Sequence, residues 1–269
     1  MPILISALIL LGISLILGIV LTLSSVFFGI KEDETYLAIR DCLPGANCGA
    51  CGYSGCDGYA KAVASKSAEI NLCIPGGDKA AREMAEILGV EPSDVVEKVA
   101  YVACNGRCGA VEKIYDYRGE QNCVAANLSY SGDKACSYAC LGYGDCAKAC
   151  PEDAICIRDG VAFVDPKKCV GCGICTRICP CNLITLIKDT TRVVVECSNH
   201  DKGALTRKEC KNGCIACMKC EKVCPVGAIK VIDNLATIDY SICTSCGECV
   251  KACPVKCIHE GNFICGTHF

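Results

Sequence analysis

The sequence predicts an α+β chain built from small modules: an apolar N-terminal helix, a small α-helical module, and two tandem copies of a hairpin-containing module. Three observations lead to this prediction. Thirty of the 269 residues are cysteines and tryptophan is absent, so a cysteine-built scaffold is expected rather than one large aromatic core. The first 30 residues carry no charged side chain. The spacing of the cysteines in the middle of the chain recurs in its last third.

Residues 3–30 form an apolar run that is long enough to cross a bilayer, which takes about 20 residues in a helix. A cleaved signal peptide is the alternative, but it has a basic start and a shorter apolar core. No Lys or Arg precedes this run, whereas Lys31 and Arg40 follow it. Positive charge on the C-terminal flank favours a cytoplasmic position for the rest of the chain. We therefore expect a single-pass transmembrane anchor over residues 1–30, in the cell membrane.

Three stretches share the pattern C-x2-C-x2-C-x3-C-P, and they begin at Cys169, Cys214 and Cys243. This is the bacterial ferredoxin pattern, in which three cysteines hold one [4Fe–4S] cluster and the fourth ligates the other cluster of a pair. Zinc sites usually take two separated C-x2-C pairs, and disulfides between such close neighbours are strained. The spacing therefore favours iron–sulfur clusters over a zinc-stapled interaction protein or an exported disulfide-rich protein.

The cysteine-rich region is a tandem repeat with a constant shift in residue number, which maps Cys140 onto Cys214 and Cys169 onto Cys243. Each copy contains two short strand-like runs around a turn, at Asp159-Gly160 in the first and Asp233-Asn234 in the second. We expect two two-cluster ferredoxin domains with one hairpin each, over residues 136–190 and 191–269.

One ligand breaks the repeat, because position 143 is Tyr where its counterpart 217 is Cys. Cys136 is the nearest upstream cysteine, and we expect it to fill the gap. The expected ligand sets of the first domain are Cys136, Cys140, Cys146 and Cys179 for one cluster and Cys150, Cys169, Cys172 and Cys175 for the other. Those of the second domain are Cys214, Cys217, Cys220 and Cys253, and Cys224, Cys243, Cys246 and Cys249.

Other cysteines lie outside these sets, some of them in a connector over residues 101–135. The candidates for an extra cluster are Cys104, Cys108, Cys123, Cys197 and Cys210. The alternative is that several of them are free buried thiols, since unligated cysteine is among the most buried residue types. The chain is therefore expected to hold at least five [4Fe–4S] clusters, and six if these cysteines form another.

A separate cysteine motif follows the apolar run, within a predicted module over residues 31–100. It consists of Cys48, Cys51 and Cys56 in LPGANCGACGYSGC, together with Cys73 in CIPGG. Four thiols at this spacing can hold a cluster of their own, and the intervening glycines let the backbone approach it closely. A helix with one apolar face is expected from Asp78, ending at Gly89.

These features resemble the B subunit of the Rnf complex, its iron–sulfur electron-transfer component, and the resemblance covers essentially the whole chain. It is carried by the apolar start, by DCLPGANCGACGYSGC (41–56), by CIPGG (73–77) and by the ferredoxin motifs. The stretches ACNGRCG (103–109) and CLGYGDCAKACP (140–151) resemble the longer form of this protein, which has two ferredoxin domains. The resemblance implies that Cys48, Cys51, Cys56 and Cys73 hold a membrane-near cluster.

The resemblance also implies a function. Rnf complexes pass electrons from reduced ferredoxin to NAD and couple this to sodium or proton translocation. The B subunit would accept electrons from soluble ferredoxin and relay them toward the other Rnf subunits in the membrane. The sequence has no G-x-G-x-x-G nucleotide fingerprint and no P-loop. Its net charge of −3 argues against a nucleic-acid partner.

The ferredoxin motifs alone also fit a membrane-tethered polyferredoxin that serves a hydrogenase, a dehydrogenase or a complex that reduces a redox sensor. The LPGANCGACG segment next to the predicted anchor favours the Rnf interpretation.

Overall fold

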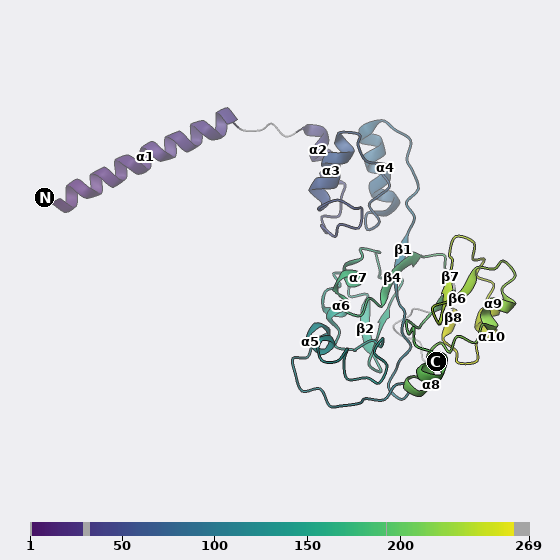
Figure 1. Ribbon diagram of the computed structural model, residues 1–269. Coiled ribbons are helices and arrows are strands. Elements are labelled where there is room, and N and C mark those ends of the chain that lie inside the picture. The colour runs from purple at the N-terminus through teal and green to yellow at the C-terminus, as the bar shows by residue number, and fades with distance from the viewer. Residues whose placement is uncertain (1, 29–32, 192, 261–269) are drawn as a thin grey trace.

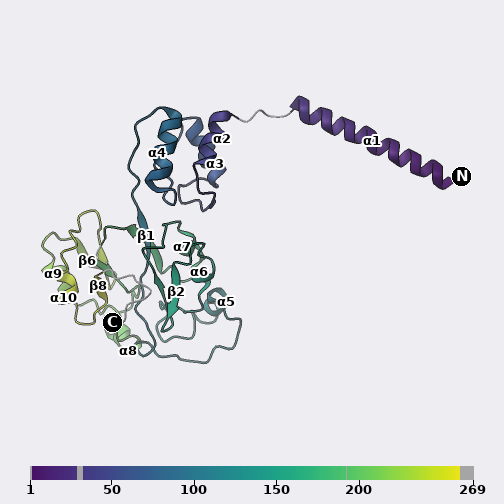
Figure 2. The ribbon, with the colours of Figure 1, turned by 180° about the vertical axis from the view of Figure 1, so that it is seen from behind.

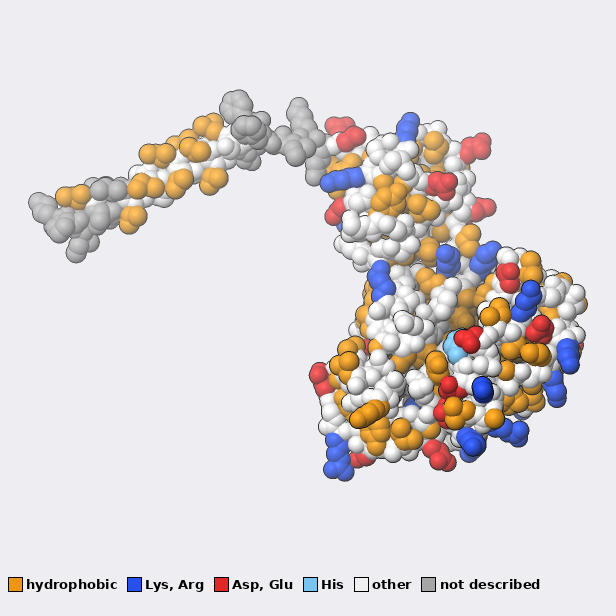
Figure 3. Space-filling model, viewed as in Figure 1, with side chains coloured by type: hydrophobic (Ala, Val, Ile, Leu, Met, Phe, Trp, Pro, Cys, Tyr) orange, Lys and Arg blue, Asp and Glu red, His pale blue; other side chains and the backbone are white. Residues whose placement is uncertain are grey.

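The computed structural model describes residues 2–28, 33–191 and 193–260, with side chains in the first range only at residues 5 and 10–24. Helix α1 (Pro2–Phe28) stands apart from the other elements in both ribbon views (Figures 1 and 2). Its described apolar side chains are exposed, among them Leu10, Leu15 and Leu21 (Figure 3). Over the side chains that the structure describes, no helix is both long and apolar enough to cross a membrane. Residues 1, 29 and 30 of the expected anchor lie outside the described residues.

The small helical module contains α2 (Glu34–Asp41), α3 (Cys56–Ala64) and α4 (Gly77–Leu88). The three helices pack around Ile39, Tyr59 and Met84, each at most 1% exposed. The predicted helix from Asp78 is confirmed as α4. Its last turn ends at Gly89, whose φ of 64° is the left-handed conformation that glycine adopts without a steric penalty.

The next module contains two antiparallel strand pairs and three short helices. Its elements are β1 (Lys98–Val102), α5 (Cys123–Leu128), α6 (Asp145–Lys148), β2 (Ile155–Arg158), β3 (Val161–Val164), α7 (Ile174–Ile178) and β4 (Ile184–Lys188). Strand β1 pairs with β4, with Val102 opposite Ile184, and β2 pairs with β3. Residues 98–100, expected in the helical module, therefore lie in a sheet of this module.

The last module repeats this plan. Its elements are β5 (Val193–Val195), α8 (Gly203–Glu209), α9 (Lys219–Val223), β6 (Ile229–Ile232), β7 (Leu235–Ile238), α10 (Glu248–Ala252) and β8 (Ile258–Glu260). Strand β5 pairs with β8, with Val195 opposite Ile258, and β6 pairs with β7. The two cysteine-rich modules lie side by side below the helical module in Figure 1.

The two predicted hairpins are confirmed as β2–β3 and β6–β7. Their turns fall at the predicted positions, where Asp159, Gly160, Asp233 and Asn234 all have positive φ. Asn, Asp and Gly tolerate this conformation better than other residues do, which is why these residues mark the turns in the sequence.

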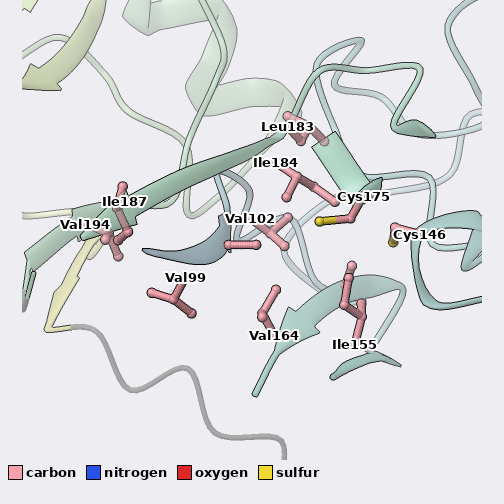
Figure 4. Packing of buried hydrophobic residues seen from close by; sticks show 12 residues of the cluster. Val99, Val102, Cys146, Ile155, Val164, Cys175, Leu183, Ile184, Ile187 and Val194 are labelled. Carbon is pink, nitrogen blue, oxygen red and sulfur yellow. The ribbon is translucent and has the colours of Figure 1, made fainter. Parts of the chain in front are cut away.

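A shared apolar core joins the strands of the first cysteine-rich module to β5 of the second (Figure 4). Ala100, Leu183 and Val194 are its most buried residues, each at most 1% exposed. Cys146 and Cys175 lie at one end of this core. The core thereby fixes the positions of the loops that carry the cysteine motifs.

Candidate metal centres

The structure gathers 24 cysteines into six groups of four. We number the groups from the helical module, which holds group 1, to the last module, which holds group 6. Group 1 is Cys48, Cys51, Cys56 and Cys73; group 2 is Cys150, Cys169, Cys172 and Cys175; group 3 is Cys123, Cys140, Cys146 and Cys179. Group 4 is Cys104, Cys136, Cys197 and Cys210; group 5 is Cys214, Cys217, Cys220 and Cys253; group 6 is Cys224, Cys243, Cys246 and Cys249.

Group 1 lies in the loops that precede α3 and α4 and at the first residue of α3, Cys56. Burial raises the pKa of the Cys73 thiol, and the nearby thiols of Cys56, Cys51 and Cys48 raise it further. A Cβ atom at Gly76 would lie 3.0 Å from the Cys73 Sγ and 2.7 Å from the Cβ of Ala80. Only glycine leaves this space open, so the backbone forms a tight cradle beside the thiols.

Group 2 contains the four cysteines expected from the first complete ferredoxin motif. Burial raises the pKa of Cys175 to about 12, with further contributions from the thiols of Cys169, Cys172 and Cys150. Cys150 comes from the end of the neighbouring motif, as the ferredoxin pattern predicts.

Group 3 differs from the expected set, because the structure places Cys123 rather than Cys136 with the other three cysteines. Cys123, Cys140, Cys146 and Cys179 line one cavity. The backbone N–H of Cys123, at the start of α5, donates a 2.8 Å hydrogen bond to Oδ2 of Asp145 beside Cys146. This bond holds the start of α5, and with it Cys123, beside the motif in which Tyr143 stands in place of a cysteine.

Cys181 also lines the group 3 cavity. Burial raises the pKa of Cys181 to about 12, and the nearby thiols of Cys179, Cys140 and Cys123 raise it further. Its Sγ donates a 3.7 Å hydrogen bond to Oδ1 of Asn127. Because the Cys181 thiol has this partner, we assign Cys123 as the fourth member of the group.

Group 4 draws two cysteines from each module around one cavity. Burial raises the pKa of Cys136 to about 11 and that of Cys197 to about 12. The side chain of Asn199, itself 1% exposed, donates a 3.4 Å hydrogen bond to the Cys136 Sγ. Asn199 was not among the residues predicted from the sequence.

The four cysteines of group 4 are related in pairs by the fold. Val102 and Val195 pair with Ile184 and Ile258, which are equivalent positions of the tandem repeat. Val102 is thus the structural counterpart of Val195, and two residues further on Cys104 is the counterpart of Cys197. Cys136 and Cys210 are counterparts by the constant shift of the repeat.

This pairing corrects the predicted grouping of the extra cysteines. The constant repeat shift pairs Cys123 with Cys197, but Cys123 lines the group 3 cavity whereas Cys197 lines the group 4 cavity. Cys108 is exposed and does not line the group 4 cavity. Of the five candidate residues, the structure brings together Cys104, Cys197 and Cys210, and adds Cys136 to them.

Groups 5 and 6 contain the expected cysteines of the second domain. Burial raises the pKa of Cys220 to about 11, and the thiols of Cys214, Cys217 and Cys253 raise it further. The four cysteines of group 6 line one cavity. Cysteines of both groups pack in a single apolar cluster with Ile229 and Ile258.

Backbone N–H groups are aimed at the sulfur atoms in several groups. The fourth cysteine of three motifs accepts a hydrogen bond from the residue four positions later: Ala154 to Cys150 at 3.4 Å, Leu183 to Cys179 at 3.5 Å and Ala228 to Cys224 at 3.2 Å. Such N–H···S bonds stabilise negative charge on sulfur and tune iron–sulfur clusters. The donor set and the thiol groups therefore fit [4Fe–4S] clusters.

Within the described residues, no group of three or more His, Cys, Asp and Glu is placed to hold a single metal ion. A single ion binds all its thiolates at about 2.3 Å, whereas a cubane bonds each thiolate to a different iron atom. The cubane therefore requires a wider arrangement of the four sulfur atoms than a single ion does.

Neighbouring groups lie close to one another in the structure. The thiol of Cys48 in group 1 is among the neighbours that raise the pKa of Cys172 in group 2, after burial. Cys175 of group 2 acts in the same way on Cys146 of group 3. Groups 3 and 4 are joined by a hydrogen bond from the N–H of Cys140 to the Sγ of Cys104, and groups 4 and 5 by one from Cys214 to Cys197.

Family models match three stretches of the chain that contain cysteine motifs. An Fe-S cluster model matches residues 43–75, a 4Fe-4S binding domain matches residues 162–185, and a 4Fe-4S dicluster domain matches residues 213–257. The first covers group 1, and the others cover parts of the two cysteine-rich modules.

Three curated relatives are similar over most of the chain, and each is the B subunit of its complex. The relative from the Na+-translocating ferredoxin:NAD+ oxidoreductase complex of Acetobacterium woodii is 44% identical, over 91% of this chain and 74% of the relative. The relative from the proton-translocating ferredoxin:NAD+ oxidoreductase complex of Clostridium ljungdahlii is 44% identical, over 86% of this chain and 82% of the relative. The relative from the ion-translocating oxidoreductase complex of Methanosarcina acetivorans is 38% identical, over 87% of this chain and 89% of the relative.

Proposed function

Because this chain belongs to the family of B subunits of Rnf-type ion-translocating ferredoxin:NAD+ oxidoreductases, we propose that it accepts electrons from reduced ferredoxin and relays them to the other subunits of such a complex. Those subunits would reduce NAD and translocate Na+ or H+. The observation that supports the proposal is the placement of 24 cysteines in six neighbouring groups of four.

Each group is proposed to ligate one [4Fe–4S] cluster, which gives six clusters. A bound cluster of this type accepts and releases single electrons. The protein contributes the four thiolates, the N–H···S hydrogen bonds and an apolar surrounding. Together these hold the ligands fixed and set how strongly added negative charge is stabilised.

The proximity of neighbouring groups supports a linear relay. Group 6 lies in the last module, and groups 5, 4, 3 and 2 lead from it to group 1 in the helical module. Group 4 is central to this order, because it draws two thiols from each cysteine-rich module. We propose that electrons enter at the C-terminal module and leave through group 1.

The relatives' complexes translocate ions, which supports an association of this chain with a membrane. We propose that α1 is its anchor, since exposed leucines at positions 10, 15 and 21 are costly in water and favourable in lipid. The positive charges of Lys31 and Arg40 support a cytoplasmic position for the cysteine-rich modules.

The iron and acid-labile sulfide contents of the anaerobically reconstituted chain test the proposal. About 24 iron atoms per chain are expected for six clusters, and about 20 would leave one group without a cluster. EPR spectra after dithionite reduction should show interacting signals. Zinc in place of iron would contradict the proposed function.

The Cys51→Ala variant tests the order of the relay. It should lose about four iron atoms, and the other clusters should still be reduced by ferredoxin, because group 1 stands at the end of the succession. If the other clusters can no longer be reduced in this variant, electrons do not leave through group 1.

A further inference from the structure

Lys134 is a buried cation beside the central cysteine groups. Its side chain is part of a residue that is 6% exposed. The Nζ atom donates hydrogen bonds to the carbonyl oxygens of Gly106, at 3.1 Å, and Gly160, at 2.8 Å. Among the described residues, no carboxylate oxygen lies within the 4.0 Å of an ion pair with it. The adjacent Asp133 instead pairs with Lys113, at 2.6 Å.

A buried ammonium group without a carboxylate partner is unfavourable in a finished fold. Moving such a charge out of water costs several kcal/mol, even after the surroundings relax. Two carbonyl dipoles offset part of this cost but supply no net negative charge. Clusters bound by the neighbouring cysteines would supply net negative charge beside it.

Lys134 lies beside groups 3 and 4 through the two peptide units that it binds. The carbonyl oxygen of Gly160 faces the loop that follows Cys140 of group 3, since a Cβ atom at Gly142 would lie 2.5 Å from it. The N–H of Gly106 donates a 3.3 Å hydrogen bond to the Cys104 Sγ, while the carbonyl of the same residue accepts from Lys134. Burial raises the pKa of Cys140 to about 11, and the charge of Lys134 acts in the opposite direction. Burial also raises the pKa of Cys210, and the charge of Lys134 again acts to lower it.

Resting on the proposed function, we infer that Lys134 is the buried counter-charge of the clusters in groups 3 and 4 and raises their reduction potentials. Four thiolates give each loaded group a net negative charge, and each one-electron reduction by ferredoxin adds another. A fixed positive charge in a poorly hydrated site stabilises the reduced form more than the oxidised form. Lys134 therefore acts on the clusters at the junction of the two modules through its charge, without being a ligand.

The repeat supplies a matched control. Lys134 stands two residues before Cys136, and its counterpart in the repeat, Lys208, stands two residues before Cys210. Lys208 is exposed at the end of α8. Replacing either lysine removes one positive charge at the same sequence distance from a group 4 cysteine, but only Lys134 is buried.

The test is an EPR-monitored redox titration of the full reconstituted chain and of four variants of it. The variants are Lys134→Met, Lys134→Gln, Lys134→Arg and Lys208→Met. In Lys134→Met and Lys134→Gln, the midpoint potential of at least one cluster should fall by about 59 mV or more, a tenfold change in its ratio of reduced to oxidised forms. Lys134→Arg and Lys208→Met should keep the potentials of the unsubstituted chain.

The iron content separates charge from packing. If Lys134→Met and Lys134→Gln lose iron while Lys134→Arg keeps it, the charge is needed for the clusters to bind, which also supports the inference. Unchanged potentials in fully loaded Lys134→Met and Lys134→Gln overturn it, as does an equal loss of iron from Lys134→Arg. Both of these outcomes leave the proposed relay intact. An unsubstituted chain that binds no iron would instead contradict the proposed function.

Discussion

The backbone N–H of Cys140 donates a 3.3 Å hydrogen bond to the Sγ of Cys104, which lies far upstream in the sequence. Its counterpart in the second module is the 3.2 Å bond from Cys214 to Cys197. In each case a cysteine at the head of a ferredoxin motif donates to a cysteine that follows a sheet strand. The two bonds connect group 4 to the groups on both sides of it, so that the modules share one four-cysteine centre.

The membership of groups 3 and 4 can be tested by removing one thiol from each. Cys123→Ser and Cys136→Ser should each lose about four iron atoms, and the double variant about eight, because the two cysteines lie in different groups. Iron and sulfide analysis of the reconstituted variants measures this. If both cysteines served one cluster, the double variant would lose no more iron than either single variant.

Cys181→Ala is the matched control, since Cys181 lines the same cavity as Cys123. Its thiol donates to Oδ1 of Asn127 and Cys123 is the assigned fourth ligand, so this variant should retain its full iron content. A loss of about four iron atoms from Cys181→Ala, with none from Cys123→Ser, would assign the fourth position of group 3 to Cys181.

A rescue experiment tests why Cys123 is needed at all. Tyr143 occupies the position that Cys217 holds in group 5. Adding Tyr143→Cys to Cys123→Ser should restore about four iron atoms, because it rebuilds the complete C-x2-C-x2-C motif. The ring of Tyr143 packs edge-on against Tyr117, with ring centroids 5.8 Å apart, so some loss of stability is expected. No regain of iron in the double variant would mean that the loop around position 143 cannot reach the cluster.

Much of this architecture is visible in the sequence, because local spacing determines it. The Asp159-Gly160 turn can be predicted from residues that are close together in the chain. The assignment of Cys123 and Cys136 cannot, because it depends on β1 pairing with β4, a strand at the opposite end of the module. That pairing makes Cys104 the counterpart of Cys197, whereas the constant repeat shift points to Cys123. Lys134 was missed for a related reason, since nothing in its local sequence indicates that it is buried.

Cys257 is expected to tune group 5 without ligating its cluster. It is 1% exposed, and its Sγ lies 3.6 Å from that of Cys253. Contact with Cys257 lowers the pKa of Cys253 to about 5, as expected for a thiol that donates to a thiolate. Cys257→Ala should therefore keep its iron and show a lower midpoint potential for one cluster in a redox titration.

Alanine is already present at the corresponding positions after two other motifs, as Ala154 and Ala228. The substitution is therefore compatible with the fold of the loop. Loss of about four iron atoms from Cys257→Ala would identify Cys257 as a ligand instead. An unchanged potential would show that its thiol has no influence on the cluster.

Two glycines with the same backbone conformation allow the attachment of group 2 to β1 to be tested. Gly171 and Gly227 both have a φ of +65°, but a Cβ atom at Gly171 would lie 2.4 Å from the carbonyl oxygen of Lys98, whereas one at Gly227 would meet nothing within 4 Å. Gly227→Ala should cost about 1–2 kcal/mol of stability, the penalty for a left-handed alanine. Gly171→Ala carries the same penalty and also displaces the backbone between Cys169 and Cys172. It should therefore lose cluster absorbance at a clearly lower guanidinium concentration than Gly227→Ala. Equal midpoints for the two variants would show that the loop of group 2 moves away from β1 at little cost.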